Sequence, residues 1–205
     1  GEFIHESVQN IKLGEQENIT LKLENREIQS ERVLVAAGAW SHQLASQLGV
    51  KIPLETERGY HVTLNSKEGG PQNIVMEAGH KFMATPMEMG VRFAGTAEFA
   101  GLKTPANQTR AEILLKLGKK MYPQLEDGES SDWMGHRPSL PDSRPVIDFC
   151  SGNRKIIFAF GHGHRGLIGA PMTARLVAEL ASGRKPTIDI SAFNLSLIHI
   201  SEPTR

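Results

Sequence analysis

The run FAFGHGHRG, from Phe158 to Gly166, joins an apolar strand to a glycine-rich loop. A helix should follow, because an apolar stripe recurs every fourth residue at Ile168, Met172, Leu176 and Leu180. Since Pro171 is tolerated only in a first turn, this helix should begin between 167 and 170. Its first N–H groups lack intrahelical partners and carry the positive end of the helix dipole. The loop therefore favours an anion or a polarised carbonyl in front of it, unless its glycines serve only to pack a turn.

The composition is that of an ordinary globular protein. The chain has 205 residues, 39% of them hydrophobic, enough for one large domain or two small ones. Lysine plus arginine number 23, as do aspartate plus glutamate, and this balance gives no support for a nucleic-acid partner. No apolar stretch is long enough to span a membrane. The single cysteine, Cys150, excludes an intramolecular disulfide, and we expect a packed or surface thiol there.

The N-terminal region predicts three strands, over 2–13, 18–24 and 27–38. The third ends in the unbroken apolar run VLVAA, from Val33 to Ala37. A strand that is apolar on both faces belongs inside a larger α/β sheet. The other strands of that sheet are expected either later in the chain or outside it.

The last eleven residues, LSLIHISEPTR at 195–205, resemble the translation of a transposon-derived sequencing adapter. We therefore expect this segment to be a non-native tail that plays no part in packing. It is left out of the reasoning about the fold.

The middle of the chain predicts antiparallel structure. A strand, turn and helix unit is expected over 27–49, with Gly49 as the helix stop. Residues 52–64 alternate between apolar and polar positions, which indicates a long strand with one apolar face. That face carries Ile52, Leu54, Tyr60, Val62 and Leu64. Two further strands, near 80–86 and 91–98, flank a tight turn and complete a meander.

A helix is expected over 109–121, where Thr109 and Glu112 form a capping-box pattern and Pro123 ends the apolar stripe. The last third then alternates strand, turn, strand, loop and helix, and ends at Gly183. Antiparallel material between two α/β pieces is the pattern of one domain inserted into another.

Five ordered segments of the chain resemble the C-terminal half of FAD-dependent amino-acid oxidoreductases, most closely the bacterial D-amino acid dehydrogenase branch, with glycine and sarcosine oxidases as relatives. The segments are VLVAAGAWS from Val33, ERGYHVTL from Glu57, VRFAGTAEFAG from Val91, WMGHRPSLPDSRPVI from Trp133 and FAFGHGHRGLIGAPM from Phe158.

The resemblance implies a mixed α/β fold, in which a Rossmann-like FAD-binding domain is interrupted by an antiparallel substrate domain. Residues 1–50 would be a remnant of the FAD-binding domain, 51–134 the substrate domain and 135–194 the C-terminal part of the FAD-binding domain. The N-terminal dinucleotide-binding βαβ unit, with its Gly-x-Gly-x-x-Gly turn, is missing. The 205 residues alone are therefore expected to be inactive and to bind FAD weakly or not at all.

The resemblance also assigns cofactor contacts. The glycine-rich loop would lie at the pyrimidine edge of the flavin, where hydrogen-bond donors stabilise the charge of the reduced ring. The expected cofactor-binding residues are Ala37, Gly38, Gly161, His162, Gly163, His164, Gly166 and Leu167. The alternative is plain turn glycines. His162 and His164 have a spacing that can ligate a metal, but no metal is expected, because they lie in a loop with no acidic residue or cysteine nearby.

Three residues are candidates for the substrate. Arg137 occupies the place of an arginine in the related enzymes, and its guanidinium could hold a carboxylate by two parallel hydrogen bonds. The alternative for Arg137 is a surface salt bridge, and Arg165 is a second candidate for the carboxylate. Tyr60 is a third, although a tyrosine on an apolar face is more often part of the core.

The predicted activity is oxidation of D-amino acids. Hydride would pass from the substrate Cα to flavin N5, and the imine would hydrolyse to a keto acid and ammonia. The alternatives are a secondary-amine oxidase for sarcosine, glycine or proline, and a flavin-free binding module that keeps the fold. The expected partners are a small amino-acid substrate and an electron acceptor that the sequence leaves open between quinone and oxygen. We expect a cytoplasmic location, with peripheral association with the inner membrane as the alternative.

Overall fold

The computed structural model of the protein describes residues 1–14 and 18–199. The chain divides into two compact units. Unit 1 consists of Gly1–Glu55 and Arg137–Arg205, and unit 2 of Thr56–His136. The predicted antiparallel segment, 51–134, overlaps unit 2. Helices and antiparallel sheets occur together, which confirms the predicted mixed α/β class.

Unit 1 carries the elements from both ends of the chain. Its strands are β1 (Asn10–Leu13), β2 (Ile19–Lys22), β3 (Glu27–Ser30), β4 (Val33–Val35), β10 (Val146–Cys150) and β11 (Asn153–Phe160). Its α-helices are α1 (Ser41–Gln47) and α3 (Gly166–Ala181). Its short 3-10 helices are η1 (Gly38–Trp40), η2 (Gly163–Arg165), η3 (Ser191–Phe193) and η4 (Leu195–His199).

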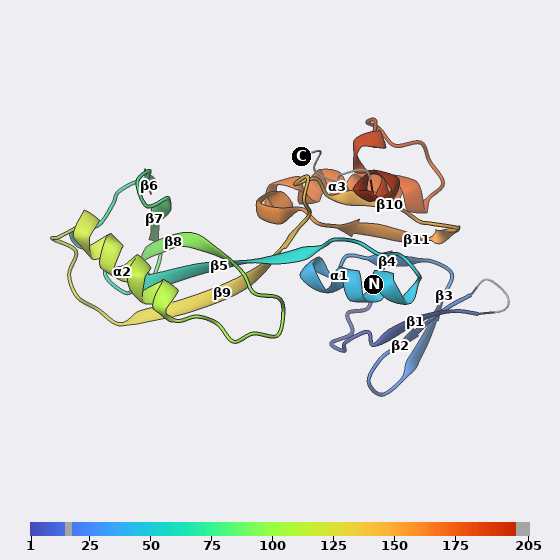
Figure 1. The fold of residues 1–205 in the computed structure, drawn as a ribbon, viewed down its shortest axis with the longest axis horizontal. Coiled ribbons are helices and arrows are strands. Elements are labelled where there is room, and N and C mark those ends of the chain that lie inside the picture. Colours follow the sequence, from blue (N-terminus) through green and yellow to red (C-terminus); the bar gives the residue numbers. More distant parts are fainter. Residues whose placement is uncertain (15–17, 200–205) are drawn as a thin grey trace. The chain divides into compact units, whose positions relative to one another are not determined.

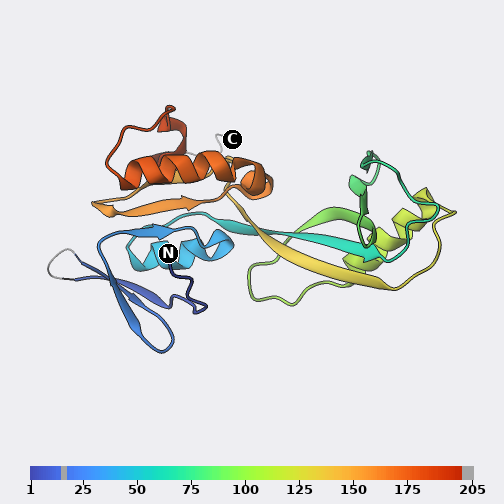
Figure 2. The same cartoon turned by 180° about the vertical axis from the view of Figure 1, so that it is seen from behind.

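Unit 1 is layered around the sheet β10-β11-β4. Helix α3 covers one face of this sheet, as Figures 1 and 2 show, and buries Leu176, Val177 and Leu180 there. The opposite face packs against α1 and the separate sheet β1-β2-β3. The glycine-rich loop connects β11 to α3. The packing of α3 on the sheet therefore fixes where this loop lies.

The predicted single strand over 27–38 is wrong in one respect, because it is two strands in two sheets. β3 pairs with β2, and after the exposed Glu31 and Arg32 the chain crosses to pair β4 with β11. β4 is also not buried on both faces, since Leu34 is 46% exposed. Leu34 instead lines an apolar groove of about 1010 Å³, together with Phe3, Val8, Ile11, Val33, Trp40 and Leu44.

Helix α3 begins one residue before the predicted range, at Gly166. Pro171 is therefore the sixth helical residue, and the expectation that it lies in the first turn is wrong. The predicted apolar stripe is buried only in its second half. Ile168 and Met172 are exposed, whereas Leu176 and Leu180 reach the sheet. The helix stops as predicted before Gly183, whose φ of +70° suits a glycine.

The C-terminal segment does pack, in part. Leu195 is 3% exposed within the core of unit 1, and its N–H donates to Asp148 Oδ2 at 2.9 Å. The expectation that residues from 195 onward play no part in packing is therefore wrong for Leu195, which begins η4. Residues 200–205 of the predicted tail lie outside the described residues.

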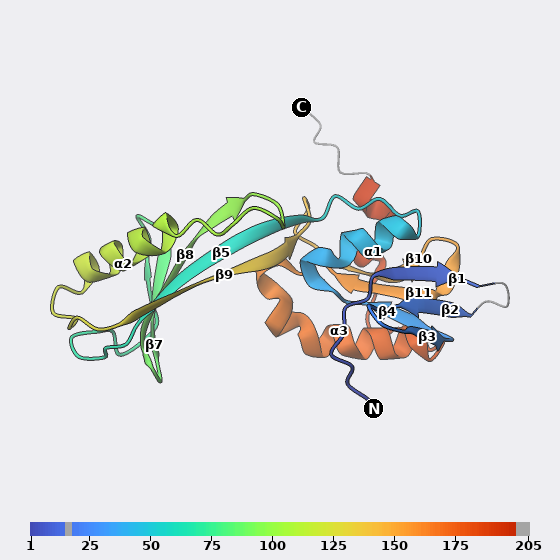
Figure 3. The same cartoon turned by 90° about the horizontal axis from the view of Figure 1, so that it is seen from below.

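Unit 2 is built on one five-stranded sheet and one helix. Its strands are β5 (Glu55–Leu64), β6 (Val75–Glu77), β7 (Phe82–Met87), β8 (Gly90–Phe99) and β9 (Ser130–Ser139), in the order β6-β7-β8-β5-β9. Its helix is α2 (Thr109–Met121), which lies along β8 in Figure 3. The strands β5 and β9 continue across the boundary between the units.

The predicted helix over 109–121 has the observed bounds of α2, but the predicted capping box does not form. Gln108 is the N-cap residue, and no side chain within the described residues caps the helix there. The apolar parity of β5 is confirmed: Tyr60, Val62 and Leu64 are buried against α2. One face of the sheet in unit 2 is therefore the core of that unit.

Candidate functional site

The glycine-rich loop and the loop after Val35 lie at the same edge of a sheet. β4 and β11 are adjacent parallel strands, with Val33 opposite Ile156 and Val35 opposite Phe158. The carboxyl ends of both strands therefore point the same way, and this edge is where ligands bind in open α/β sheets. Ala37 and Gly38 follow β4, and the loop from Gly161 follows β11. The structure thus brings the two predicted groups of cofactor-binding residues together.

The backbone at this edge requires glycine. Gly38, Gly161 and Gly163 all have positive φ, of +55°, +85° and +52°. A Cβ on Gly161 would lie 2.6 Å from Leu140 Cδ1, so the loop packs tightly on its inner side. A Cβ on Gly38 would have no described atom within 4 Å, so the space in front of this backbone is open. The glycines are also spaced as Gly-x-Gly-x-x-Gly, a signal that the sequence analysis did not use.

The N-terminus of α3 is open to a ligand. Arg165 is the N-cap residue, and within the described part of the chain no side chain caps the helix there. The helix dipole then favours an electron-rich group at this end. Gly166 is the first residue of the helix, and the next residue, Leu167, is 92% exposed. An exposed leucine beside open backbone N–H groups suits a planar ring with polar edges.

The two histidines of the loop differ in environment. His162 is half-buried, and a 2.9 Å hydrogen bond joins its Nε2 to Thr173 Oγ1 on α3. Burial lowers the pKa of His162, so its ring stays neutral and ties the loop to the helix. His164 and Arg165 are exposed in η2. Within the described residues, no group of three or more metal-ligating side chains occurs.

Arg137 lies on a strand that ends beside the glycine-rich loop. Its side chain is half-buried on β9, two residues before Ser139. A Cβ on Gly163 would lie 3.6 Å from Ser139 Oγ, so the end of β9 runs beside the loop within unit 1. The chain therefore places the candidate carboxylate anchor on a strand that ends at the candidate cofactor site.

Tyr60 lies elsewhere, in the core of unit 2. It is 3% exposed, and its hydroxyl donates to Glu98 Oε2 at 2.5 Å and accepts from the N–H of Asn107 at 3.1 Å. The Arg110 guanidinium lies 5.8 Å from the centre of its ring. This environment favours the core role over contact with the substrate.

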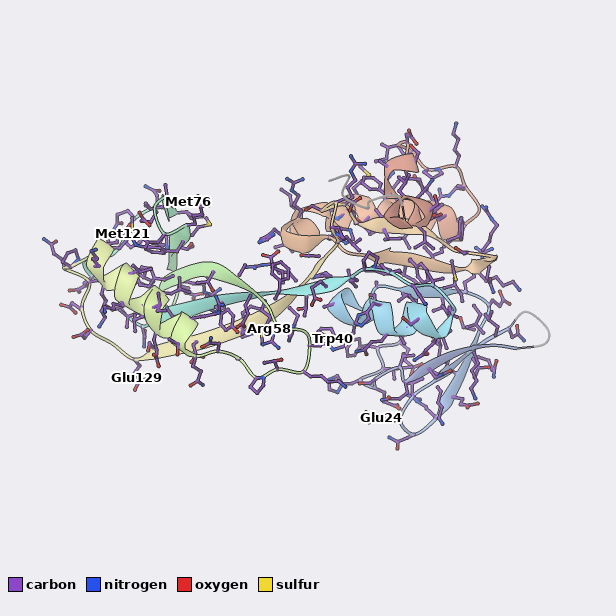
Figure 4. All side chains as sticks on the ribbon, in the orientation of Figure 1. Glu24, Trp40, Arg58, Met76, Met121 and Glu129 are labelled. Atoms are coloured by element: carbon purple, nitrogen blue, oxygen red, sulfur yellow. The ribbon has the colours of Figure 1, made fainter. Side chains whose placement is uncertain are left out.

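Arg58 is a buried charge that the sequence analysis missed. Its side chain is 0% exposed, and it is labelled in Figure 4. The guanidinium donates to four backbone carbonyls, of Ala100, Gly101, Thr104 and Pro105, and lies 3.6 Å from Glu98. Its place among the apolar positions of β5 was a usable signal, because a buried arginine must be fully paired. Its role is to hold the 100–105 segment.

Residues of this edge fit a flavin. Open space at Gly38, the positive φ of Gly163 and the N-terminus of α3, which no described side chain caps, leave backbone groups accessible to a ligand at this edge. Ala37 and Leu167 add exposed apolar surface beside them.

A family model described as FAD dependent oxidoreductase matches residues 1–180. The chain belongs to this family of FAD-dependent oxidoreductases. The match confirms the predicted family, the predicted class of enzyme and the predicted cofactor, FAD.

Two curated relatives come from Bradyrhizobium diazoefficiens. A D-amino-acid oxidase is 43% identical over 188 residues, which are 90% of this chain and 45% of that protein. A D-amino acid dehydrogenase is 30% identical over 171 residues, which are 82% of this chain and 40% of that protein. The chain thus spans less than half the length of the curated relatives that it matches.

Solved structures show the same fold. Glycine oxidase from Geobacillus kaustophilus superposes with a TM-score of 0.82 at 22% identity, covering 94% of this chain and 52% of that one. L-proline dehydrogenase from P. horikoshii superposes with a TM-score of 0.76 at 19% identity, covering 96% and 54%. Within the described residues, no helix has the length and apolar character that a membrane crossing needs.

Proposed function

We propose that the enzyme containing this chain oxidises D-amino acids with FAD, giving a keto acid and ammonia after hydrolysis of the imine. The strongest support is the course of β9, which carries Arg137 and ends with Ser139 beside Gly163 of the glycine-rich loop. The 43% identity to a D-amino-acid oxidase supports the same substrate class. The electron acceptor, quinone or oxygen, is left open by these observations.

The residues divide the work between cofactor and substrate. FAD, when bound, supplies a hydride acceptor for the substrate Cα. Ala37, Gly38 and the loop from Gly161 to Leu167 would hold it by backbone N–H groups. Arg137 would hold the substrate carboxylate by two hydrogen bonds and so fix the direction of the Cα–H bond. Arg165 is the second candidate for this role, because it is exposed at the same loop.

No residue of the chain has to act as a general base. The amine is oxidised in its neutral form, so its proton is lost to solvent before the reaction. His162 is held neutral by burial and is bonded to Thr173, which suits a role in fixing the loop.

The test is the substitution Arg137→Lys in the complete FAD-loaded enzyme. Lysine keeps the charge but cannot form the paired hydrogen bonds. We expect the kcat/KM for a D-amino acid to fall roughly 30- to 1000-fold, or about 2–4 kcal/mol, with flavin content unchanged. The matched control is Arg26→Lys, at a partly exposed arginine that pairs with Glu6.

An amine substrate without a carboxylate distinguishes the possible roles of Arg137. It should lose little more than the control, because it offers nothing for the guanidinium to hold. Equal losses for both substrates, or loss of flavin, would show that Arg137 is structural and that Arg165 is the anchor to examine. Absence of flavin from the complete wild-type protein would instead favour a binding module that only keeps the fold.

A further inference from the structure

The N-terminal turns of α3 have a sequence that is poorly suited to a helix. They contain Gly166, Gly169 and Pro171, and glycine and proline are the two weakest helix formers. Pro171 also has no N–H to donate to the carbonyl of Leu167, four residues before it. By intrinsic propensity alone, this end of α3 should fray.

Packing of apolar side chains gives the same turns little support. Leu167 is 92% and Ile168 85% exposed, and the buried residues of α3 begin only at Leu176. The N-cap residue is Arg165, and no described side chain caps the helix there. The support of these turns must therefore come from another contact.

His162 makes that contact. A Cβ on Gly166 would lie 3.5 Å from His162 Cβ, and one on Gly169 would lie 3.7 Å from His162 Cδ2. A hydrogen bond of 2.9 Å joins His162 Nε2 to Thr173 Oγ1. Gly166, Gly169 and Thr173 follow one another at i, i+3 and i+7, so they lie on one face of the helix. The imidazole therefore lies along this face, over the first two turns of α3.

His162 is itself anchored in the glycine-rich loop. The preceding residue, Gly161, packs against Leu140, where a Cβ would come within 2.6 Å of Cδ1. The carbonyl of His162 accepts the N–H of Arg165 at 2.9 Å, which closes the short helix η2. The His162 side chain thus connects a fixed point of the loop to α3. A change in its size or bonding should displace the first N–H groups of the helix.

The position of these N–H groups matters because the proposed function places FAD in front of them. Reduction of a flavin develops negative charge on the pyrimidine half of its ring, where hydrogen-bond donors stabilise it. The favourable effect of a helix dipole is confined to the first turn, so it depends on where that turn lies. A displaced first turn would therefore leave a flavin that is harder to reduce.

We propose that His162 is a positioning residue, which holds the N-terminal turns of α3 where their N–H groups stabilise the reduced flavin. This inference rests on the proposed function in one respect, because it takes the glycine-rich loop as a cofactor contact. It is independent of the amino acid that is oxidised and of the role given to Arg137. His162 acts through the helix and transfers neither a proton nor a hydride.

The first experiment uses sulfite as a probe of the complete FAD-loaded enzyme and needs no turnover. The sulfur lone pair of sulfite forms a bond to flavin N5, and the ring takes up the negative charge. Loss of flavin absorbance then gives the dissociation constant of sulfite. His162→Leu should raise this constant roughly 3- to 30-fold, because the helix end no longer faces the charge.

The flavin midpoint potential, measured with a redox dye, tests the same charge without any nucleophile. In His162→Leu it should fall by about 15–45 mV, which is the same fold-change converted at about 30 mV for each tenfold in a two-electron couple. Thr173→Val removes only the hydrogen-bond partner and should shift both quantities in the same direction. Thr173→Ser keeps the hydroxyl and should stay within about 2-fold of wild type.

The matched control is Thr187→Val, which acts at the other end of α3. Thr187 Oγ1 donates to Glu179 Oε1, so this variant also loses a hydrogen bond between a threonine and the helix. It should lower stability but leave the sulfite dissociation constant and the midpoint potential unchanged. An equal shift in Thr187→Val would show that both quantities follow the general stability of α3, and the inference would be wrong.

Unchanged sulfite binding and potential in FAD-loaded His162→Leu would also overturn the inference. If His162→Leu loses its FAD, Thr173→Val decides, and wild-type values in that variant would refute the positioning role. A wild type that oxidises no D-amino acid would refute the proposed function alone. The shift in His162→Leu would still support the role of His162 in that case.

Discussion

At the scale of single residues, apolar parity predicts burial but not the partners of a buried polar atom. Tyr60, Val62 and Leu64 face the core as the alternation along 52–64 predicts. The same parity includes Arg58, which is fully buried because the loop at 100–105 surrounds its guanidinium with carbonyls. That loop is more than forty residues away in sequence, so no local pattern could reveal it. The partners of the Tyr60 hydroxyl, Glu98 and Asn107, are also distant in sequence. Local patterns therefore leave both a substrate contact and a core position possible for Tyr60.

Tyr60→Phe tests the core role. The substitution removes one hydroxyl and leaves Glu98 and the N–H of Asn107 without it. We expect the free energy of unfolding to fall by about 1–2 kcal/mol, measured by denaturant titration. The kcat/KM of the complete enzyme for a D-amino acid should stay within about 2-fold. A large loss of kcat/KM at unchanged stability would return Tyr60 to the substrate site.

At the scale of elements, long periodic segments are predictable and their ends are less so. The stripe over 109–121 gives α2 its bounds, yet its capping box is absent because Thr109 is already helical and Gln108 is the N-cap residue. In α3 the stripe is half right, since the sheet beneath it reaches Leu176 and Leu180 but not Ile168. The apolar run at 33–37 predicts a strand that is buried on both faces. In the structure one side of β4 is open, and Leu34 lines an apolar groove there.

The short helix η4 provides a prediction for the C-terminal segment. Leu195 packs against the core of unit 1 and donates its N–H to Asp148. Leu195→Ala should therefore lower the free energy of unfolding by about 2–4 kcal/mol, through lost burial and a cavity. The control is Ser196→Ala, at an exposed neighbour that should change stability by less than about 0.5 kcal/mol. Equal stability of both variants in denaturant titration would show that the segment does not dock.

At the scale of the whole molecule, the candidate site depends on strands that are distant in sequence. The glycine-rich loop and the strand before Gly38 were identified from local patterns, and the parallel pairing of β4 with β11 unites them. The resemblance to amine-oxidising enzymes pointed to Arg137, but only the packing of Ser139 against Gly163 shows where its strand ends. In unit 2, the row of Met83, Ala94 and His61 on one face of the sheet likewise arises from strand register, and a one-residue shift would move these side chains to the other face. For that reason the sequence alone did not predict it.

The free energy of unfolding should decrease as pH is lowered, and histidines should cause this loss before the carboxylates take up protons. Burial lowers the pKa of His61, His136 and His162 from the ordinary value of 6.5, and the nearby Arg58 adds to the shift at His136. The unfolded chain therefore takes up protons below about pH 6.5 that the folded chain does not, so stability is full above that pH and is lost as pH falls. The lowered pKa values of Glu98 and Glu179 act in the same direction only below their ordinary value of 4.5.

Denaturant titration between pH 7.5 and 5.5 measures this loss, and His162→Gln tests how much comes from the glycine-rich loop. Glutamine can still bond to Thr173 but takes up no proton, so the variant should lose less stability than wild type over this range. His5→Gln is the control for the substitution itself, because His5 is exposed and lies outside the glycine-rich loop. A wild-type stability that is flat between these pH values, or a His162→Gln slope equal to that of wild type, would contradict the neutral, loop-fixing role given to His162.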